Sequence, residues 1–124
     1  MKQITTNSAP KAIGPYSQAI LSNNFLFISC QFPVDLLNGN LIEGSPSLQA
    51  EIILKNIGEI LKAAGLTYKN IVKTEIFLSR MDYFAEVNKA YSPFFSEPYP
   101  ARTTIEAGSL PKGADIGIAA IAAL

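Results

Sequence analysis

One segment, from Ser45 to Gly65, constrains the fold more than any other, because it has the start, the stripe and the end of an amphipathic helix. Ser45 offers a capping hydroxyl, and Pro46 is well tolerated in a first helical turn. Apolar residues then recur at the helical period, and Gly65 follows as a C-terminal stop. These residues are Ile53, Ile57, Ile60, Leu61 and Ala64. The sequence therefore predicts a helix from 46 to 64 whose apolar face covers another layer.

Short segments on both sides of this helix predict strands. Residues 25–29 are almost wholly apolar, which indicates a strand buried on both faces. Asn38-Gly39 is typical of a tight hairpin turn, so residues 34–37 and 41–42 are predicted to pair as a ribbon. The remaining strand candidates are residues 71–78, 102–107 and 115–124.

Alternation assigns the two faces of the later strands. Within residues 71–78, one face is predicted to carry Val72, Thr74, Ile76 and Leu78, and the other Lys73 and Glu75. In the last strand, one face carries Ile116, Ile118 and Ala120, and the other carries Gly117, Ala119 and Ile121.

A second helix completes the predicted order of elements. Asp82 is predicted to cap this helix, which runs to about Phe95. The order β-β-α-β-α-β-β over a single domain of residues 1–124 predicts an α+β fold, with a mixed sheet and two helices packed on one face. The other face then stays apolar at Phe25 and Phe27, so we expect the chain to oligomerise through it.

Composition removes several kinds of chemistry. The chain has ten basic and ten acidic side chains, one cysteine (Cys30) and no histidine. A histidine general base, a nucleophile paired with histidine and an intramolecular disulfide are therefore excluded. We expect no metal site, and any catalysis has to use arginine, carboxylates, hydroxyls, backbone groups and water.

Charge and hydropathy narrow the partners and the location. Zero net charge without a basic stripe argues against a nucleic-acid partner. The longest apolar stretch, Ile116–Leu124, has nine residues, whereas a membrane-spanning helix needs about 20. The first ten residues lack the features of a signal peptide, and a single cysteine fits a reducing compartment, so we expect a cytoplasmic protein without a membrane partner.

A few residues stand where a ligand could be held. Arg102 follows a rigid Pro-Tyr-Pro loop, and a guanidinium fixed there suits a carboxylate gripped through two parallel hydrogen bonds. A structural ion pair or a surface charge is the alternative. Tyr16, in the stiff turn after Gly14-Pro15, could present its hydroxyl to a ligand or pack within its loop. The further candidates, each of which could equally be structural, are Ser29, Cys30 and Asn88.

Taken together, blocks along the whole chain resemble the RidA/YjgF family of small imine deaminases. The blocks are Gly14-Pro15-Tyr16-Ser17-Gln18-Ala19, Ser29-Cys30-Gln31-Phe32-Pro33, Ala63-Ala64-Gly65-Leu66, Val72-Lys73-Thr74, Phe84-Ala85-Glu86-Val87-Asn88, Pro100-Ala101-Arg102 and Leu110-Pro111-Lys112. The resemblance implies a chorismate-mutase-like fold, a homotrimer with ligand pockets between subunits, and no cofactor. It also implies hydrolysis of 2-iminobutanoate and 2-iminopropanoate to 2-keto acids and ammonia.

The family pattern suggests a role for each matching residue. Arg102 corresponds to the arginine that holds the substrate carboxylate, Tyr16 to the loop tyrosine and Ser29 to the strand-end serine. Asn88 corresponds to the asparagine that lines the cleft, and the backbone of Thr104 would help to orient the substrate. A protonated imine is already electrophilic, so the protein has only to orient it and deliver a water.

Three positions depart from that pattern. Gly117 stands where the family has the glutamate that helps to activate the water, Thr104 replaces a pocket cysteine, and Cys30 replaces a glycine. Glu106 could supply a carboxylate instead, because it shares one strand face with Arg102 and Thr104; a surface charge is the alternative.

Three hypotheses follow. The first is an imine deaminase, weak because of Gly117. The second is a non-catalytic trimer that binds small carboxylates as a metabolite sensor. The third is the ribonuclease or translation-inhibitor activity attached to some relatives, against which the zero net charge and the absence of histidine both speak.

Overall fold

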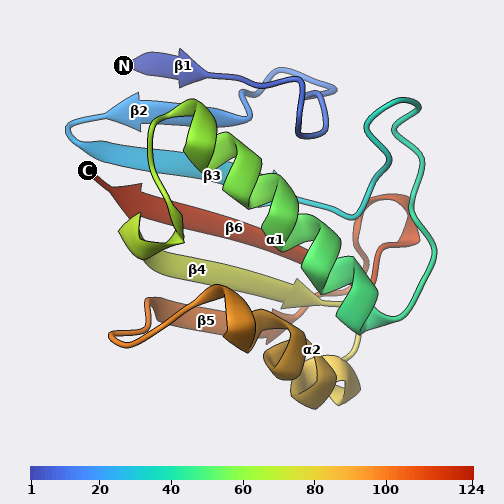
Figure 1. The fold of residues 1–124 in the computed structure, drawn as a ribbon. Coiled ribbons are helices and arrows are strands. Elements are labelled where there is room, and N and C mark those ends of the chain that lie inside the picture. The colour runs from blue at the N-terminus through green and yellow to red at the C-terminus, as the bar shows by residue number, and fades with distance from the viewer.

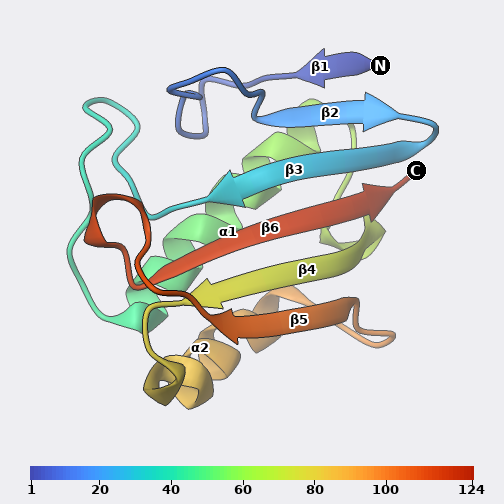
Figure 2. The ribbon, with the colours of Figure 1, turned by 180° about the vertical axis from the view of Figure 1, so that it is seen from behind.

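The computed structural model describes residues 1–124 and contains one mixed six-stranded sheet with two α-helices. The elements are β1 (Lys2–Ile4), β2 (Ala19–Ser22), β3 (Phe25–Gln31), α1 (Pro46–Ala63), β4 (Ile71–Leu78), α2 (Phe84–Tyr91), β5 (Ala101–Glu106) and β6 (Ile116–Ala123). The strands lie in the order β1-β2-β3-β6-β4-β5, and both helices pack on one face (Figure 1). The view from behind shows no helix over the other face (Figure 2). The predicted α+β class is confirmed.

The sheet is mixed because its last strands run both ways. β6 lies antiparallel between β3 and β4, whereas β4 and the edge strand β5 are parallel. A parallel pair needs a crossover connection, and α2 provides it. Neither helix combines the length and the apolar composition needed to cross a membrane.

Helix α1 has the predicted ends and the predicted apolar stripe. The Ser45 hydroxyl accepts a hydrogen bond from the Leu48 N–H at 3.2 Å. At the other end Gly65 has a φ of +75°, and the Leu66 N–H donates to the Leu61 carbonyl at 2.9 Å. Six apolar side chains of the helix are fully buried: Ala50, Ile53, Leu54, Ile57, Ile60 and Leu61.

The N-terminal part of the sheet differs from the prediction. β1 and β2 were not predicted, because strands of three and four residues carry little pattern. β2 turns into β3 through Asn23 and Asn24, both at positive φ, which suits a tight hairpin. The predicted ribbon of 34–37 with 41–42 is reduced to one bridge between Val34 and Leu41. Three strands therefore precede α1.

The second helix is shorter than predicted and is not capped by Asp82. The Asp82 carboxylate accepts from the Arg80 guanidinium at 2.8 Å, on an exposed surface. The chain enters α2 through a 3-10 turn at Met81–Tyr83, without a side-chain cap. The α-helix ends at Tyr91, where Ser92–Phe94 form another 3-10 turn, because the proline at position 93 has no N–H for a helical bond.

Two strand faces also need correction. β3 is covered on one face only, since Phe25 and Phe27 are 42% and 45% exposed. In β4 a register shift between Ile71 and Lys73 leaves Val72 exposed, and Ile71 takes its place in the core. The other predicted faces of β4 and of β6 are confirmed by burial, because Thr74, Ile76 and Leu78, and Ile116, Ile118 and Ala120, are the buried residues.

Candidate functional site

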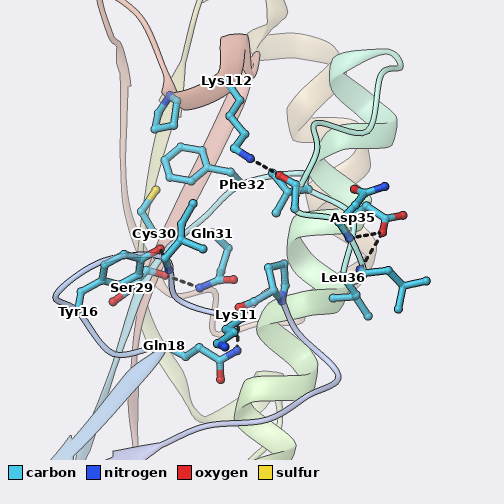
Figure 3. Close-up of a pocket in the computed structure, with 17 residues that line it drawn as sticks. Lys11, Tyr16, Gln18, Ser29, Cys30, Gln31, Phe32, Asp35, Leu36 and Lys112 are labelled. Carbon is cyan, nitrogen blue, oxygen red and sulfur yellow. Dashed lines mark hydrogen bonds between the residues drawn. The ribbon is translucent and has the colours of Figure 1, made fainter.

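The first group of candidate residues surrounds a cavity of about 760 Å³ where β3 ends and the loop before β6 folds back (Figure 3). Tyr16, Ser29 and Cys30 line this cavity. The sequence did not single out the rest of the lining, which comes from Gln18, Gln31 and the loops around residues 10–13, 32–39 and 111–112. Its walls are largely apolar, and the side chains of Lys11 and Lys112 belong to the lining (Figure 3).

Tyr16 is held in this group by a tightly bonded loop. Its N–H donates to the Gly14 carbonyl at 2.8 Å, while its ring stays half exposed. The loop is anchored by Gln18, which is 3% exposed. The Gln18 amide accepts from the Thr6 N–H and donates to the carbonyls of Thr6, Ala9 and Pro10. Sequence reasoning missed this residue, because a glutamine in a loop gives no sign of being buried.

Neither Ser29 nor Cys30 is prepared to act as a nucleophile. The Ser29 hydroxyl donates to the Ser17 carbonyl at 2.6 Å, so its proton is already engaged. Burial, together with the negative charge of Glu75, raises the pKa of the Cys30 thiol to about 12. The thiolate is the reactive form, so this cysteine is inert near neutral pH.

Gly117 lies under two side chains of the first group. A Cβ atom on Gly117 would come within 2.6 Å of a Phe32 ring carbon and 2.9 Å of the Cys30 sulfur. Its φ is ordinary, so the glycine is required for space and not for backbone conformation. The position where the family pattern expects a carboxylate is thus occupied by Phe32 and Cys30. Phe32 is another residue that the sequence did not single out.

The second group of candidates forms a smaller cavity of about 320 Å³ beside α2. Arg102 and Asn88 line it, together with Tyr91, Ser92, Tyr99 and Pro100. The Arg102 guanidinium lies 5.1 Å from the centre of the Tyr91 ring and 5.5 Å from that of Phe84. Aromatic faces attract a guanidinium and hold it in place.

Arg102 has no carboxylate partner within the chain. The single ion pair of the structure joins Arg80 to Asp82. The alternative of a structural ion pair at Arg102 is therefore wrong for the single chain. Burial raises the pKa of the Tyr91 hydroxyl, which shares a hydrogen bond of 2.8 Å with the Thr74 hydroxyl. The Tyr91 side chain, which lines the smaller cavity, therefore stays neutral.

Thr104 and Glu106 share the helix-covered face of β5 with Arg102, since they pair with Ile76 and Leu78, two buried residues of β4. The Thr104 hydroxyl is buried and has no hydrogen-bond partner. Glu106 accepts a hydrogen bond from the Met81 N–H at 2.7 Å. This contact gives Glu106 a structural role at the entry to α2, and it lines neither cavity.

The two groups do not meet within one chain. Two strands, β6 and β4, separate β3 from β5 in the sheet. Arg102 lies on the face covered by α2, whereas Cys30 contacts the Gly117 side of β6, on the uncovered face. A single chain thus carries two separate groups of candidate residues. The chain gathers no cluster of three or more histidine, cysteine or acidic side chains that could hold a metal ion.

Comparison with known proteins gives a consistent result over the whole chain. The family model described as Endoribonuclease L-PSP matches residues 6–124. The human 2-iminobutanoate/2-iminopropanoate deaminase is 44% identical over 119 residues, which are 96% of this chain and 87% of the human protein. The RutC family protein y4sK of Sinorhizobium fredii is 44% identical over 124 residues, covering 100% of this chain and 98% of that protein.

Solved structures agree with these sequence matches. The crystal structure of RidA from Psychrobacter sp. PAMC 21119 superposes with a TM-score of 0.94 at 37% identity, and each chain is covered completely. The structure of E. coli TdcF with bound serine gives a TM-score of 0.93 at 36% identity, covering 100% of this chain and 99% of that one. By its sequence and by its fold, the chain belongs to the Endoribonuclease L-PSP family, which is the RidA/YjgF family that its sequence blocks resemble.

Proposed function

We propose that the protein hydrolyses small 2-imino acids, such as 2-iminobutanoate and 2-iminopropanoate, to 2-keto acids and ammonia. The observation that carries this proposal is the Arg102 guanidinium, held over two aromatic rings in a small cavity and left without a carboxylate partner. Such a group is ready to bind the carboxylate of a small acid through paired hydrogen bonds. The names of relatives at 44% identity supply the reaction.

The separation of the two groups of candidate residues supports a pocket built between copies of the chain. We propose a homotrimer in which Arg102 of one copy meets Tyr16 and Ser29 of the next. The uncovered sheet face supports this arrangement, because Phe25 and Phe27 would be buried by a second copy. The TdcF structure contains serine, which carries the same α-carboxylate as an imino acid.

Each group has a role in the proposed reaction. Arg102 holds the substrate carboxylate, and Asn88 lies in the same cavity to orient the substrate. Thr104 contributes backbone groups, since its hydroxyl is buried. A protonated imine needs no further activation, so orientation and a delivered water are sufficient for turnover. The lone cysteine has no disulfide partner, and we place the activity in the cytoplasm.

The test is the release of ammonia from 2-iminobutanoate generated enzymatically in the assay. We expect Arg102→Ala to lower kcat/KM by about 10²-fold or more, since a charge-assisted hydrogen-bonded contact contributes about 1.5–3 kcal/mol and two are lost here. Arg80→Ala is the matched control, because this exposed arginine bonds only Asp82. Equal activities of the wild type and Arg102→Ala, including equal inactivity, would contradict the proposal.

A second candidate function is favoured by one observation, the occupation of the space above Gly117 by Phe32 and Cys30. A site without a carboxylate on β6 could bind small acids and not turn them over. Isothermal titration with 2-ketobutyrate would then detect binding that depends on Arg102, while the ammonia assay stays at the blank rate. Turnover above the blank would remove this candidate.

A further inference from the structure

The uncovered face of the sheet carries one carboxylate, Glu75, close to the position where the family pattern expects one. Glu75 of β4 pairs with Ala119 of β6. On the other side of β6, Ile28 pairs with Ala120 and Gln31 pairs with Ile118, so Ala119 lies beside the irregular segment that contains Ser29 and Cys30. A row across the sheet therefore runs from Ser29 and Cys30, over Ala119, to Glu75.

The β6 position within this row, Ala119, carries only a methyl group. β3 and β4 lie two strand spacings apart, which is about 9–10 Å. Between them β6 presents Gly117, Ala119 and Ile121 on this face, and of these only Ala119 lies within the row. Phe32 and Cys30 cover the neighbouring Gly117. The Glu75 side chain can therefore extend over β6 toward the end of β3. After burial, the negative charge of Glu75 is the second cause of the raised pKa of the Cys30 thiol, which agrees with the placement of both residues on this face. The same sulfur lies 2.9 Å from where a Gly117 Cβ would be.

Glu75 is also a half-buried carboxylate without a partner. It makes no hydrogen bond, and the single ion pair of the chain lies elsewhere, between Arg80 and Asp82. Three other partly buried carboxylates have partners: Glu86 accepts from Ser47, Asp35 from the Leu37 N–H and Asp115 from Ser79. Glu59 also makes no hydrogen bond, but it belongs to α1, on the helix-covered side of the sheet. A half-buried charge without a partner is unfavourable for folding alone, which is typical of a group kept for binding or catalysis.

We propose that Glu75 is the carboxylate that activates water in this protein, in place of the glutamate that β6 lacks at Gly117. This assignment rests on the proposed imine hydrolysis. It makes Glu106 unnecessary as a substitute, because Glu106 lies on the opposite face of the sheet and is bonded to the Met81 N–H.

The chemistry balances with one carboxylate. As the water oxygen bonds to the carbon of the protonated imine, one water proton moves to Glu75 and the C=N electron pair moves to nitrogen. The Glu75 carboxylic acid then returns the proton to that nitrogen. The C–N bond breaks, ammonia leaves with the bonding pair, and the hydroxyl on carbon loses its proton to the ammonia. The products are the 2-keto acid and ammonium, and water supplies the keto oxygen.

The test compares Glu75→Gln with the wild type in the ammonia assay with 2-iminobutanoate. We expect kcat to fall by about 10²- to 10⁴-fold, which is the usual contribution of a general base. Binding of 2-ketobutyrate, measured by isothermal titration, should change less than about threefold, since Arg102 remains. Glu75→Asp should retain part of the activity, and formate should restore part of it to Glu75→Ala. Glu51→Gln, on an exposed position of α1, is the matched control.

The outcomes separate this proposal from the proposed function. An active wild type with Glu75→Gln within threefold of it would overturn the role of Glu75 and leave imine hydrolysis standing. A large fall in kcat for Glu106→Gln, with no fall for Glu75→Gln, would assign the activation of water to Glu106. A wild type that is inactive and binds 2-ketobutyrate would overturn both the hydrolysis and the role of Glu75. Loss of 2-ketobutyrate binding in Glu75→Gln would make Glu75 a binding residue and would also overturn the proposal.

Discussion

Gly117 illustrates how a single position is determined by its neighbours across the sheet. Phe32 and Cys30 reach over from the end of β3 and occupy the volume that a side chain at 117 would need. Interiors are packed too densely to absorb an extra atom at such distances without movement of a ring. The absence of a carboxylate at position 117 and the presence of the Phe32 ring above it therefore follow from the same packing.

Gly117→Ala should lower the free energy of unfolding by about 1–3 kcal/mol, because the Phe32 ring has to move away from the new methyl group. Urea unfolding at one fixed protein concentration measures the change. Gly108→Ala is the matched control, since nothing lies within 4 Å of the Cβ position there. Adding Phe32→Leu to Gly117→Ala should recover part of the stability. Equal effects at positions 117 and 108 would contradict this account of packing.

At the scale of elements, the two helices differ in how they begin. α1 has a side-chain cap from Ser45, whereas α2 begins from a 3-10 turn with no side-chain cap. Both starts carry a residue type that favours caps, namely Ser45 and Asp82. Only the local geometry decides which of them is used, because Asp82 lies two residues from Arg80 and bonds it instead.

Alanine substitutions at the N-termini of α1 and α2 should affect stability differently. Ser45→Ala should lower the free energy of unfolding by about 1 kcal/mol, because the Leu48 N–H loses its partner. Ser45→Asp should keep most of the stability. Asp82→Ala should change the stability by less than about 1 kcal/mol, since it breaks only an exposed ion pair. Thermal unfolding of the three variants measures these changes. A larger loss of stability in Asp82→Ala than in Ser45→Ala would contradict the conclusion that Ser45 caps its helix and Asp82 does not.

At the scale of the whole molecule, the sheet has one covered face and one open face. The apolar side chains of α1, β4 and β6 are buried between the helices and the sheet, and no helix covers the other face (Figure 2). Phe25 and Phe27 remain about half exposed. The group of candidate residues around Arg102 lies on the covered face, and the group around Cys30 lies toward the open one. A second copy is the simplest way to cover the open face and to complete the site at once.

Phe27→Glu should therefore dissociate the proposed trimer and abolish imine hydrolysis, because a charge would be buried without a partner in the interface. Sedimentation velocity reports the mass, and the ammonia assay reports the activity. Leu48→Glu serves as control, since Leu48 has a similar exposure of 42% but lies on α1, on the far side of the sheet. A wild type that sediments as a monomer would contradict the proposed assembly.

Local patterns in the sequence were sufficient for much of the fold. Helix α1, strand β4 and the faces of β6 follow from periods that act within one element, so they could be predicted without neighbours. β1 and β2 were missed because short strands are stabilised by pairing with β3 and not by their own composition. The exposed Val72 depends on a register shift against β6, which no property of β4 alone reveals.

The candidate site divides in the same way. The sequence by itself determined which chemical groups are available, since the absence of histidine and the placement of Arg102 after a rigid loop are properties of the chain. The tertiary structure alone decided where those groups lie. Arg102 and Tyr16 lie in separate cavities, Glu106 accepts a hydrogen bond from a backbone N–H, Phe32 lies over Gly117, and Glu75 lies on the same sheet face as Cys30. The physical reason is that space and hydrogen-bond partners are supplied by strands far apart in the sequence, whereas residue types and periods are local.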